Sequence, residues 1–193
     1  MLDPQFEKQL QHGFKYLNRF MLMLWRLGLS PMVNIWPEVG GRIMVLTHTG
    51  RKTGRTLRTP VNYALVDGEV YCVAGFGKVS DWYRNLLAHP AVEIWLPDSW
   101  WAGVAEDISE APNRVPLMRA VMIASGFAAR AAGLDPIAMT DQQLDEATRT
   151  YRLVHIHRTE ARTGPGGPGE LAWVWPLATF ILLPLVLGRR KRK

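Results

Sequence analysis

The chain has 193 residues, of which 48% are hydrophobic and 21% are charged, and this composition is typical of a globular protein with an ordinary core. Its formal net charge is +6, but the last five residues are all basic, and without them the 23 Lys and Arg residues fall to 18 against 17 Asp and Glu. A nearly neutral body argues against nucleic-acid binding, which needs a basic face. The single cysteine, Cys72, excludes an intrachain disulfide and a CxxC metal site.

Apolar residues recur every three or four positions from residue 5 to about residue 29. This spacing predicts an amphipathic helix, and we expect it to end at Ser30-Pro31, because a residue before proline avoids the helical region. Charged residues precede any apolar run, so the N-terminus does not resemble a secretory signal and we expect a cytoplasmic body.

A basic loop separates two apolar segments, residues 43–46 and 63–66, which we interpret as a pair of strands. Gly50 and Gly54 bound the tip of this loop, and threonines are interleaved with its cations. The four cations are Arg51, Lys52, Arg55 and Arg58. Cations and free backbone N–H groups on a tight loop suit an anion such as a phosphate, and a solvated hairpin tip is the competing interpretation. The loop is not a Walker A motif, which needs Gly directly before the Lys.

The rest of the body reads as short strands and helices. Asp67-Gly68 predicts a tight hairpin into a strand over 69–75, and Ser80 is expected to cap a helix through about residue 87. We expect further strands at 91–96, 100–105 and 151–158, and helices at 114–132 and 140–149. Six strands with hairpin connections predict an antiparallel sheet or barrel and exclude a Rossmann fold.

Few side chains suggest catalysis by themselves. His155 and His157 share one face of the last strand and could hold a metal, but the sequence offers no third ligand, so we expect no metal site. His48 lies beside the basic loop, where it could contact an anion or simply be a polar residue at a strand edge. Cys72 lies in an apolar run, and no nucleophile is evident, so in an enzyme a cofactor would carry the chemistry.

Four segments in this order resemble the deazaflavin-dependent nitroreductase family, also described as coenzyme F(420)-dependent quinone reductases. They are residues 49–54 with 58–61, residues 74–77, residues 80–86 and residues 88–90, and the resemblance extends from about Ile43 to Arg158. It implies a split β-barrel of the flavin-reductase type. Together with the sequence pattern, this predicts a mainly β fold with helices: a six-stranded antiparallel split β-barrel, an N-terminal helix and a C-terminal hydrophobic helix.

The resemblance also implies a cofactor site. The anionic tail of the deazaflavin would be held by Arg51, Lys52 and Thr53, and the ring would lie against Pro60, Val61 and Asn62. An opposing loop would supply Ala74, Gly75, Phe76 and Lys78, and Arg58 and Trp82 complete the candidate cofactor-binding set. Leu57 stands where better-known members carry a further phosphate-contacting Arg, which keeps FMN open as the alternative cofactor.

The implied function is an oxidoreductase that transfers a hydride from a reduced deazaflavin to a quinone, nitro compound or similar electrophile. The alternative is a non-catalytic binder or carrier of an anionic cofactor or lipid. No catalytic side chain is assigned, and homodimer formation is left open.

The C-terminal region differs from the body. We expect a cofactor-binding domain over 1–162, a Gly/Pro linker over 163–170 and a hydrophobic segment with a basic tail over 171–193. Residues 171–187 carry no charge, which predicts a membrane anchor and a membrane-associated protein with its catalytic domain on the cytoplasmic side. The competing interpretation is a hydrophobic helix docked on the barrel or on a second subunit.

Overall fold

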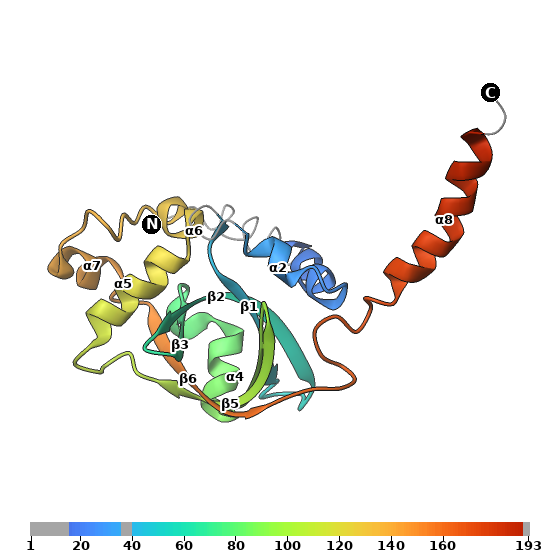
Figure 1. Ribbon diagram of the computed structural model, residues 1–193. Helices are drawn as coiled ribbons and strands as arrows, with labels where there is room; N and C mark the ends of the chain where they lie inside the picture. The colour runs from blue at the N-terminus through green and yellow to red at the C-terminus, as the bar shows by residue number, and fades with distance from the viewer. Residues whose placement is uncertain (1–15, 36–39, 191–193) are drawn as a thin grey trace.

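The computed structural model describes residues 16–35 and 40–190, and its centre is a barrel of antiparallel strands (Figure 1). The strands close in the order β1-β2-β3-β6-β5-β4, which confirms the predicted six-stranded barrel. Their bounds are β1 Ile43–Thr49, β2 Thr56–Val66, β3 Glu69–Ala74, β4 Ala91–Leu96, β5 Ser99–Asp107 and β6 Arg152–Ala161.

Hairpins set the register of the barrel. β1 and β2 pair from Ile43 opposite Asn62 to Thr49 opposite Thr56, so the basic loop forms their tip. The turn between β2 and β3 consists of Asp67 and Gly68 with φ of 51° and 81°, as the Asp-Gly signal predicts for two left-handed turn residues. Alternate side chains fill the barrel interior, and Cys72 is among them, fully buried as expected for a core residue.

Helices close the barrel and cover part of its outside. α4 (Asp81–Ala88) adds Tyr83 and Leu86 to the barrel core. α5 (Arg114–Ala124) and α7 (Asp141–Ala147) join a second apolar cluster with residues of β2 and β6. The single helix expected over 114–132 is two helices, because Gly126, with φ of +57°, separates α5 from α6 (Phe127–Ala131).

The N-terminal helix ends earlier than predicted. Of its expected range, residues 5–15 lie outside the described residues, and the chain is helical over 16–26. Gly28 then takes a φ of +76°, which ends the helix, and Ser30-Pro31 begins α2 (Ser30–Val33) instead of terminating its predecessor. Proline suits the first helical turn, because the N–H it lacks has no partner there. Trp25 packs outside the barrel with Val45 and Trp95.

The segment predicted as a linker packs against the body. The N–H groups of Gly169 and Leu171 donate to the carbonyls of Trp25 and Arg26, and Arg26 also pairs with Glu170. These contacts tie the segment to the helix at 16–26. The division of the chain into domains at 163–170 remains a prediction.

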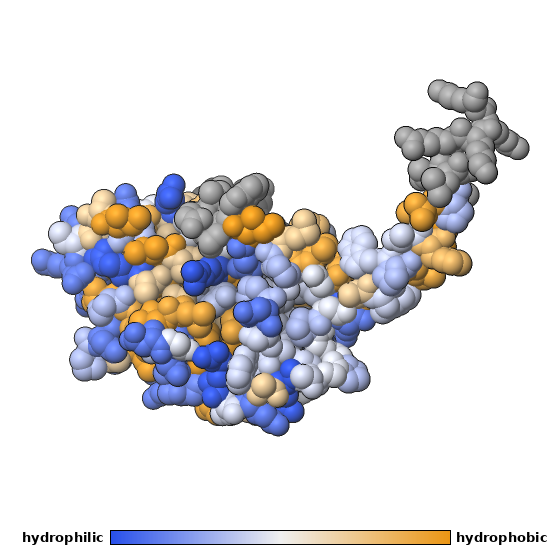
Figure 2. Space-filling view, in the orientation of Figure 1, coloured by the Kyte–Doolittle hydropathy of each residue, from blue (hydrophilic) through white to orange (hydrophobic). Residues whose placement is uncertain are grey.

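α8 (Val174–Arg190) projects away from the barrel and exposes apolar side chains between Trp175 and Leu183 (Figures 1 and 2). Its uncharged part covers only residues 174–188, about 22 Å of helix, with Pro184 inside it, whereas a bilayer core is about 30 Å thick. Among the described residues, no helix is both long and apolar enough to cross a membrane. The predicted membrane anchor at 171–187 and the membrane-associated location were therefore wrong: residues 171–173 form turns, which shortens the helix.

Candidate functional site

The basic loop is a closed turn at the tip of the β1–β2 hairpin. The Gly50 N–H donates to the Arg55 carbonyl and the Gly54 N–H donates to the Gly50 carbonyl, each at 2.8 Å. Gly54 has a φ of +64°, and a Cβ added there would contact no other atom. Glycine is therefore favoured at this position by the backbone conformation and not by lack of space. Lys52 and Arg55 are exposed on this turn.

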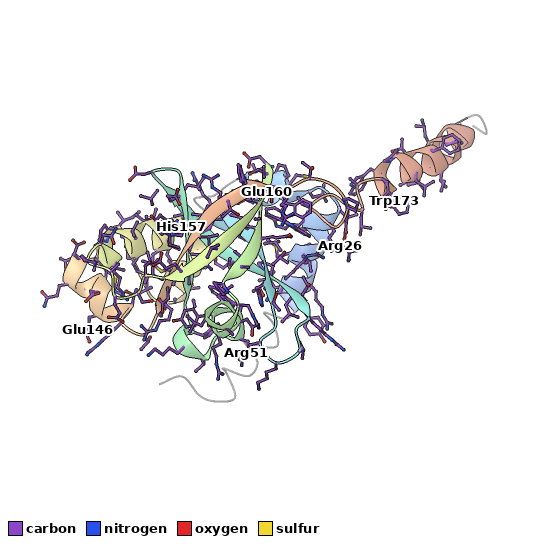
Figure 3. All side chains as sticks on the ribbon, turned by 90° about the horizontal axis from the view of Figure 1, so that it is seen from below. Arg26, Arg51, Glu146, His157, Glu160 and Trp173 are labelled. Carbon is purple, nitrogen blue, oxygen red and sulfur yellow. The ribbon has the colours of Figure 1, made fainter. Side chains whose placement is uncertain are left out.

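Arg51 fastens the loop to α4. Its backbone N–H and its Nη1 both donate to Asn85 Oδ1, at 3.1 and 2.9 Å. Its Nη2 pairs with Asp81 Oδ1 at 2.9 Å, and Figure 3 shows the side chain beside α4. Asn85 and Asp81 thus occupy much of the hydrogen-bonding capacity of the guanidinium, and these contacts hold the loop in position.

His48 completes this network from inside the barrel. It is 3% exposed, with Nδ1 3.2 Å from Asn85 Nδ2 and Nε2 3.1 Å from Thr59 Oγ1. Because Asn85 Oδ1 accepts from Arg51, the Asn85 amide nitrogen donates to His48 Nδ1, and Nε2–H donates to Thr59. Burial lowers the pKa of His48 to about 4, so it is neutral at pH 7. It is neither a cationic anion ligand nor a strand-edge residue.

A cavity with a volume of about 520 Å³ lies beside this network. It is bounded by the middle of β2, the end of β3, the start of α4 and the helices α5 and α6. Six of the predicted cofactor residues line it: Pro60, Val61, Asn62, Gly75, Phe76 and Trp82. The fold therefore brings together the two stretches that were expected to face each other across a ring.

The cavity has an apolar wall and few ionisable groups. α5 and α6 contribute Val121, Met122 and Ala128 to the lining. The ionisable side chains in the lining are Asp81, which is paired with Arg51, and Tyr151. Burial raises the pKa of Tyr151, so its phenol stays protonated at pH 7. Such a cavity can bind a planar apolar group but offers no carboxylate base free of an ion pair.

One buried hydroxyl in the cavity lining has no hydrogen-bond partner among the residues that the structure describes. Ser80 precedes α4 at the N-cap position, yet its side chain makes no capping bond, contrary to the prediction. Its Oγ is buried and unpaired although the residue lines the cavity. A buried hydroxyl without a partner is unfavourable, so this atom indicates a place for a polar ligand atom.

The remaining predicted residues lie around the cavity instead of in its lining. Ala74 is buried in the barrel core, and Lys78 is exposed on the short 3-10 helix η1 (Gly77–Val79). Lys52 and Thr53 are exposed on the basic loop. Arg58 lies outside the barrel, where Nη2 donates to the Gly166 carbonyl at 2.8 Å and the guanidinium covers the Trp95 ring at 4.6 Å. These contacts give Arg58 a packing role.

Sequence reasoning missed several lining residues: Asn18, Val79, Ser80, Asp81, Ser125, Tyr151 and the α5–α6 side chains. Ser80 and Asp81 belong to a quoted motif segment and could have been included. Tyr151 and the helices could not, because no local pattern says which part of the barrel a later helix covers.

The chain matches one protein family and resembles several solved structures. The sequence model described as F(420)H(2)-dependent quinone reductase matches residues 26–141, and no curated protein matches the chain. Among solved structures, the conserved hypothetical protein Rv2991 from Mycobacterium tuberculosis is 22% identical, with a TM-score of 0.46 over 69% of this chain and 80% of that one. An F(420)H(2)-dependent reductase, FDR-A, is 21% identical, with a TM-score of 0.44 over 60% and 93%. The heme storage protein HutZ from Vibrio cholerae is 11% identical, with a TM-score of 0.44 over 72% and 96%.

Proposed function

This chain belongs to the F(420)H(2)-dependent quinone reductase family, and from that premise we propose that it uses reduced coenzyme F(420) to reduce a quinone, a nitro compound or a similar electrophile. The observation that carries the proposal is the cavity in which Pro60–Asn62 face Gly75 and Phe76 beside the N-terminus of α4. Reduced coenzyme F(420), when bound, supplies a hydride, so the protein needs to bind, orient and exclude water.

The residues present fit this cofactor. The volume of about 520 Å³ is in the usual range for a small-molecule site, and its apolar side suits a planar ring. The unpaired Ser80 Oγ offers a hydrogen bond to a polar edge of that ring. For an anionic tail, Lys52 and Lys78 are exposed, and neither has an ion-pair partner among the described residues.

Each part of the site would have a separate task. The middle of β2 is a wall held in place by the barrel ladder, and Asn62 is fixed by its hydrogen bond to the Arg42 carbonyl at 3.2 Å. α5 and α6 cover the opposite side and reduce access of water to the ring. Lys52 would bind the tail directly, whereas Arg51 would act mainly by holding the loop against α4.

Tyr151 is our candidate for interaction with the acceptor. Reduction of a quinone needs a proton as well as a hydride, and the phenol is protonated at pH 7, since burial raises a pKa whose ordinary value is already 10.0. We place it as a hydrogen-bond donor to the acceptor oxygen through Oη. Tyr151→Phe should then lower turnover and leave the affinity for the oxidised cofactor unchanged.

Binding is the first test. The full chain is titrated with oxidised coenzyme F(420) and, separately, with FMN, and absorbance and fluorescence report binding. Lys52→Ala should weaken binding of the deazaflavin by about 1–3 kcal/mol, because a charge-assisted bond is lost. Arg55→Ala, an exposed cation on the same loop, is the matched control and should have little effect. Tighter binding of FMN than of the deazaflavin would refute the choice of cofactor.

Turnover is the second test and separates an enzyme from a carrier. Reduced coenzyme F(420) is mixed with the protein and menadione, and formation of the oxidised cofactor is followed by absorbance. Binding without oxidation, for several chemically different acceptors, would favour the alternative of a non-catalytic binder. Homodimer formation remains a prediction that sedimentation of the same sample would measure.

A further inference from the structure

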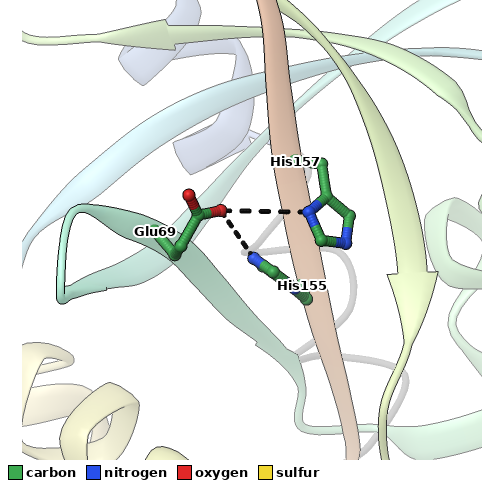
Figure 4. Close-up of side chains that lie close together, drawn as sticks. All are labelled: Glu69, His155 and His157. Carbon is green, nitrogen blue, oxygen red and sulfur yellow. Dashed lines mark hydrogen bonds and ion pairs between the residues drawn. The ribbon is translucent and has the colours of Figure 1, made fainter.

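A cluster of histidine and carboxylate side chains lies on the outer surface of the barrel, away from the cavity. It consists of Glu69, at the start of β3, and of His155 and His157 on β6 (Figure 4). Each residue offers one ligand atom, and these three atoms lie within 4.8 Å of one another. We propose that the cluster binds a divalent transition-metal ion with nitrogen and oxygen preference, such as Zn²⁺.

The strand register creates the cluster. His155 and His157 are two residues apart on β6 and therefore point to the same face. β3 runs antiparallel to β6 with Val70 opposite Ile156, so Glu69 lies one step further along, beside His157. The sequence shows the histidine pair but not the carboxylate, because Glu69 is 86 residues away from His155 along the chain.

The distances suit a shared ion. Glu69 Oε2 lies 2.8 Å from His155 Nε2 and 4.0 Å from His157 Nδ1, so one oxygen faces both rings. A tetrahedral ion with bonds of about 2.1 Å would hold its ligand atoms about 3.4 Å apart. Side-chain movements of up to about 0.7 Å at each ligand atom would reach that spacing.

Neighbouring groups orient both rings. Glu106, on β5, lies with Oε2 3.2 Å from His157 Nε2. If Nε2–H donates to this carboxylate, His157 Nδ1 keeps its lone pair toward Glu69, which is the arrangement that supports many metal-bound histidines. The His155 ring stacks on Tyr71 with centroids 4.5 Å apart. One ion would thus connect β3 directly to β6 and, through Glu106, to β5.

The surroundings leave room for the ion and for water ligands. The side chains of Glu69 and His157 are 45% and 50% exposed. Arg158 is the nearby cation, and it is directed elsewhere, because its Nη2 donates to the Gly68 carbonyl and its guanidinium covers the Trp101 ring at 5.0 Å. The two carboxylates, Glu69 and Glu106, offset its charge.

The site is separate from the proposed redox cavity. Glu69 begins β3, whereas Gly75, which lines the cavity, follows its end, so about 20 Å of extended strand separates them. Arg51 and His157 also lie far apart in Figure 3. We therefore assign the ion a structural role, clamping the strands of the barrel, which does not depend on the cofactor.

The test uses the full chain without a histidine tag, treated with EDTA and then dialysed. Titration with Zn²⁺ should show one site of micromolar affinity by calorimetry, and Co²⁺ should give visible absorption bands of a site with low coordination number. Mg²⁺ should not compete, because it prefers oxygen ligands in octahedral geometry. Saturating Zn²⁺ should raise the melting temperature.

Variants distinguish this cluster from adventitious binding. His157→Gln should weaken Zn²⁺ binding by at least about tenfold, and Glu106→Gln should weaken it by about tenfold. His157 is half exposed, so its replacement should leave the fold and cofactor binding intact, which circular dichroism and the deazaflavin titration would check. His89→Gln, at an exposed histidine outside the cluster, is the matched control and should bind Zn²⁺ like the unchanged protein. Absence of binding, or equal affinity in His157→Gln, would overturn the proposal and leave a hydrogen-bonded His–Glu network.

Discussion

The buried His48 should make the barrel sensitive to mild acid. In the folded protein burial lowers its pKa to about 4, whereas an unfolded chain gives histidine a pKa of about 6.5. As the pH falls, the unfolded state takes up this proton first. The contribution of the neutral residue to stability is therefore complete above pH 6.5 and is lost between about pH 6.5 and pH 4.

The size of the effect follows from these two pKa values. At about pH 7.5 both states are almost entirely neutral at this position, and no stability is lost. At about pH 5 the unfolded residue is nearly all protonated and the folded one is mostly neutral, which lowers the free energy of unfolding by up to about 2 kcal/mol. Protonation of His48 in the folded state would also place a proton on Nδ1. The Asn85 amide N–H, which donates to Nδ1, would then face a second donor.

The assay is urea unfolding followed by tryptophan fluorescence at both pH values, for the unchanged protein and for His48→Gln. Glutamine does not titrate in this range, so the variant should be less stable at pH 7.5 and should lose up to about 2 kcal/mol less on acidification. All other residues are the same in both proteins, so their contributions cancel in the difference. Equal loss in the two proteins would refute the reasoning.

Three further predictions concern single positions. Gly77→Ala should lower the free energy of unfolding by about 2–4 kcal/mol, because φ is +60° and a Cβ would overlap the Thr150 carbonyl. Gly54→Ala, with a similar φ but open space around the Cβ, should lower it by only about 1 kcal/mol, and urea unfolding would compare the two variants. Thr140→Ala removes the capping box of α7 and should lower the free energy of unfolding by about 1 kcal/mol, and Thr140→Ser should restore most of it. Arg58→Met removes the hydrogen bond to Gly166, so segment 163–170 should be cleaved faster by a protease of broad specificity while cofactor affinity holds; unchanged cleavage would contradict the packing role of Arg58.

Local chemistry made much of the fold predictable. The Asp67-Gly68 pair identified its hairpin because few other dipeptides tolerate two positive φ values, and alternating or apolar runs identified the strands. Gly126 lies inside an apolar run, and the pattern predicted one continuous helix there, although a glycine can end a helix. The helix boundary at Ser30-Pro31 was misplaced because proline suits the start of a helix as well as the residues after its end.

The candidate site was predictable only where it is local. Pro60–Asn62 and Gly75-Phe76 were found through motif segments, and the barrel brings them to one cavity. The partners of Arg51 and Arg58 were not predictable, because they come from positions 34 and 108 residues away. Glu69, which completes the proposed metal cluster, was missed for the same reason, because the register between distant strands places it beside the histidines.

The tether formed by Asn85 has a consequence for how an anion would be captured. Because Asn85 receives two hydrogen bonds from Arg51 and donates one to the barrel through His48, the loop is already arranged before any ligand arrives. Its conformational entropy is lost when the chain folds and not when a phosphate binds. Association should therefore resemble docking to a rigid surface, with a rate that depends on ionic strength through Lys52 and little on loop rearrangement.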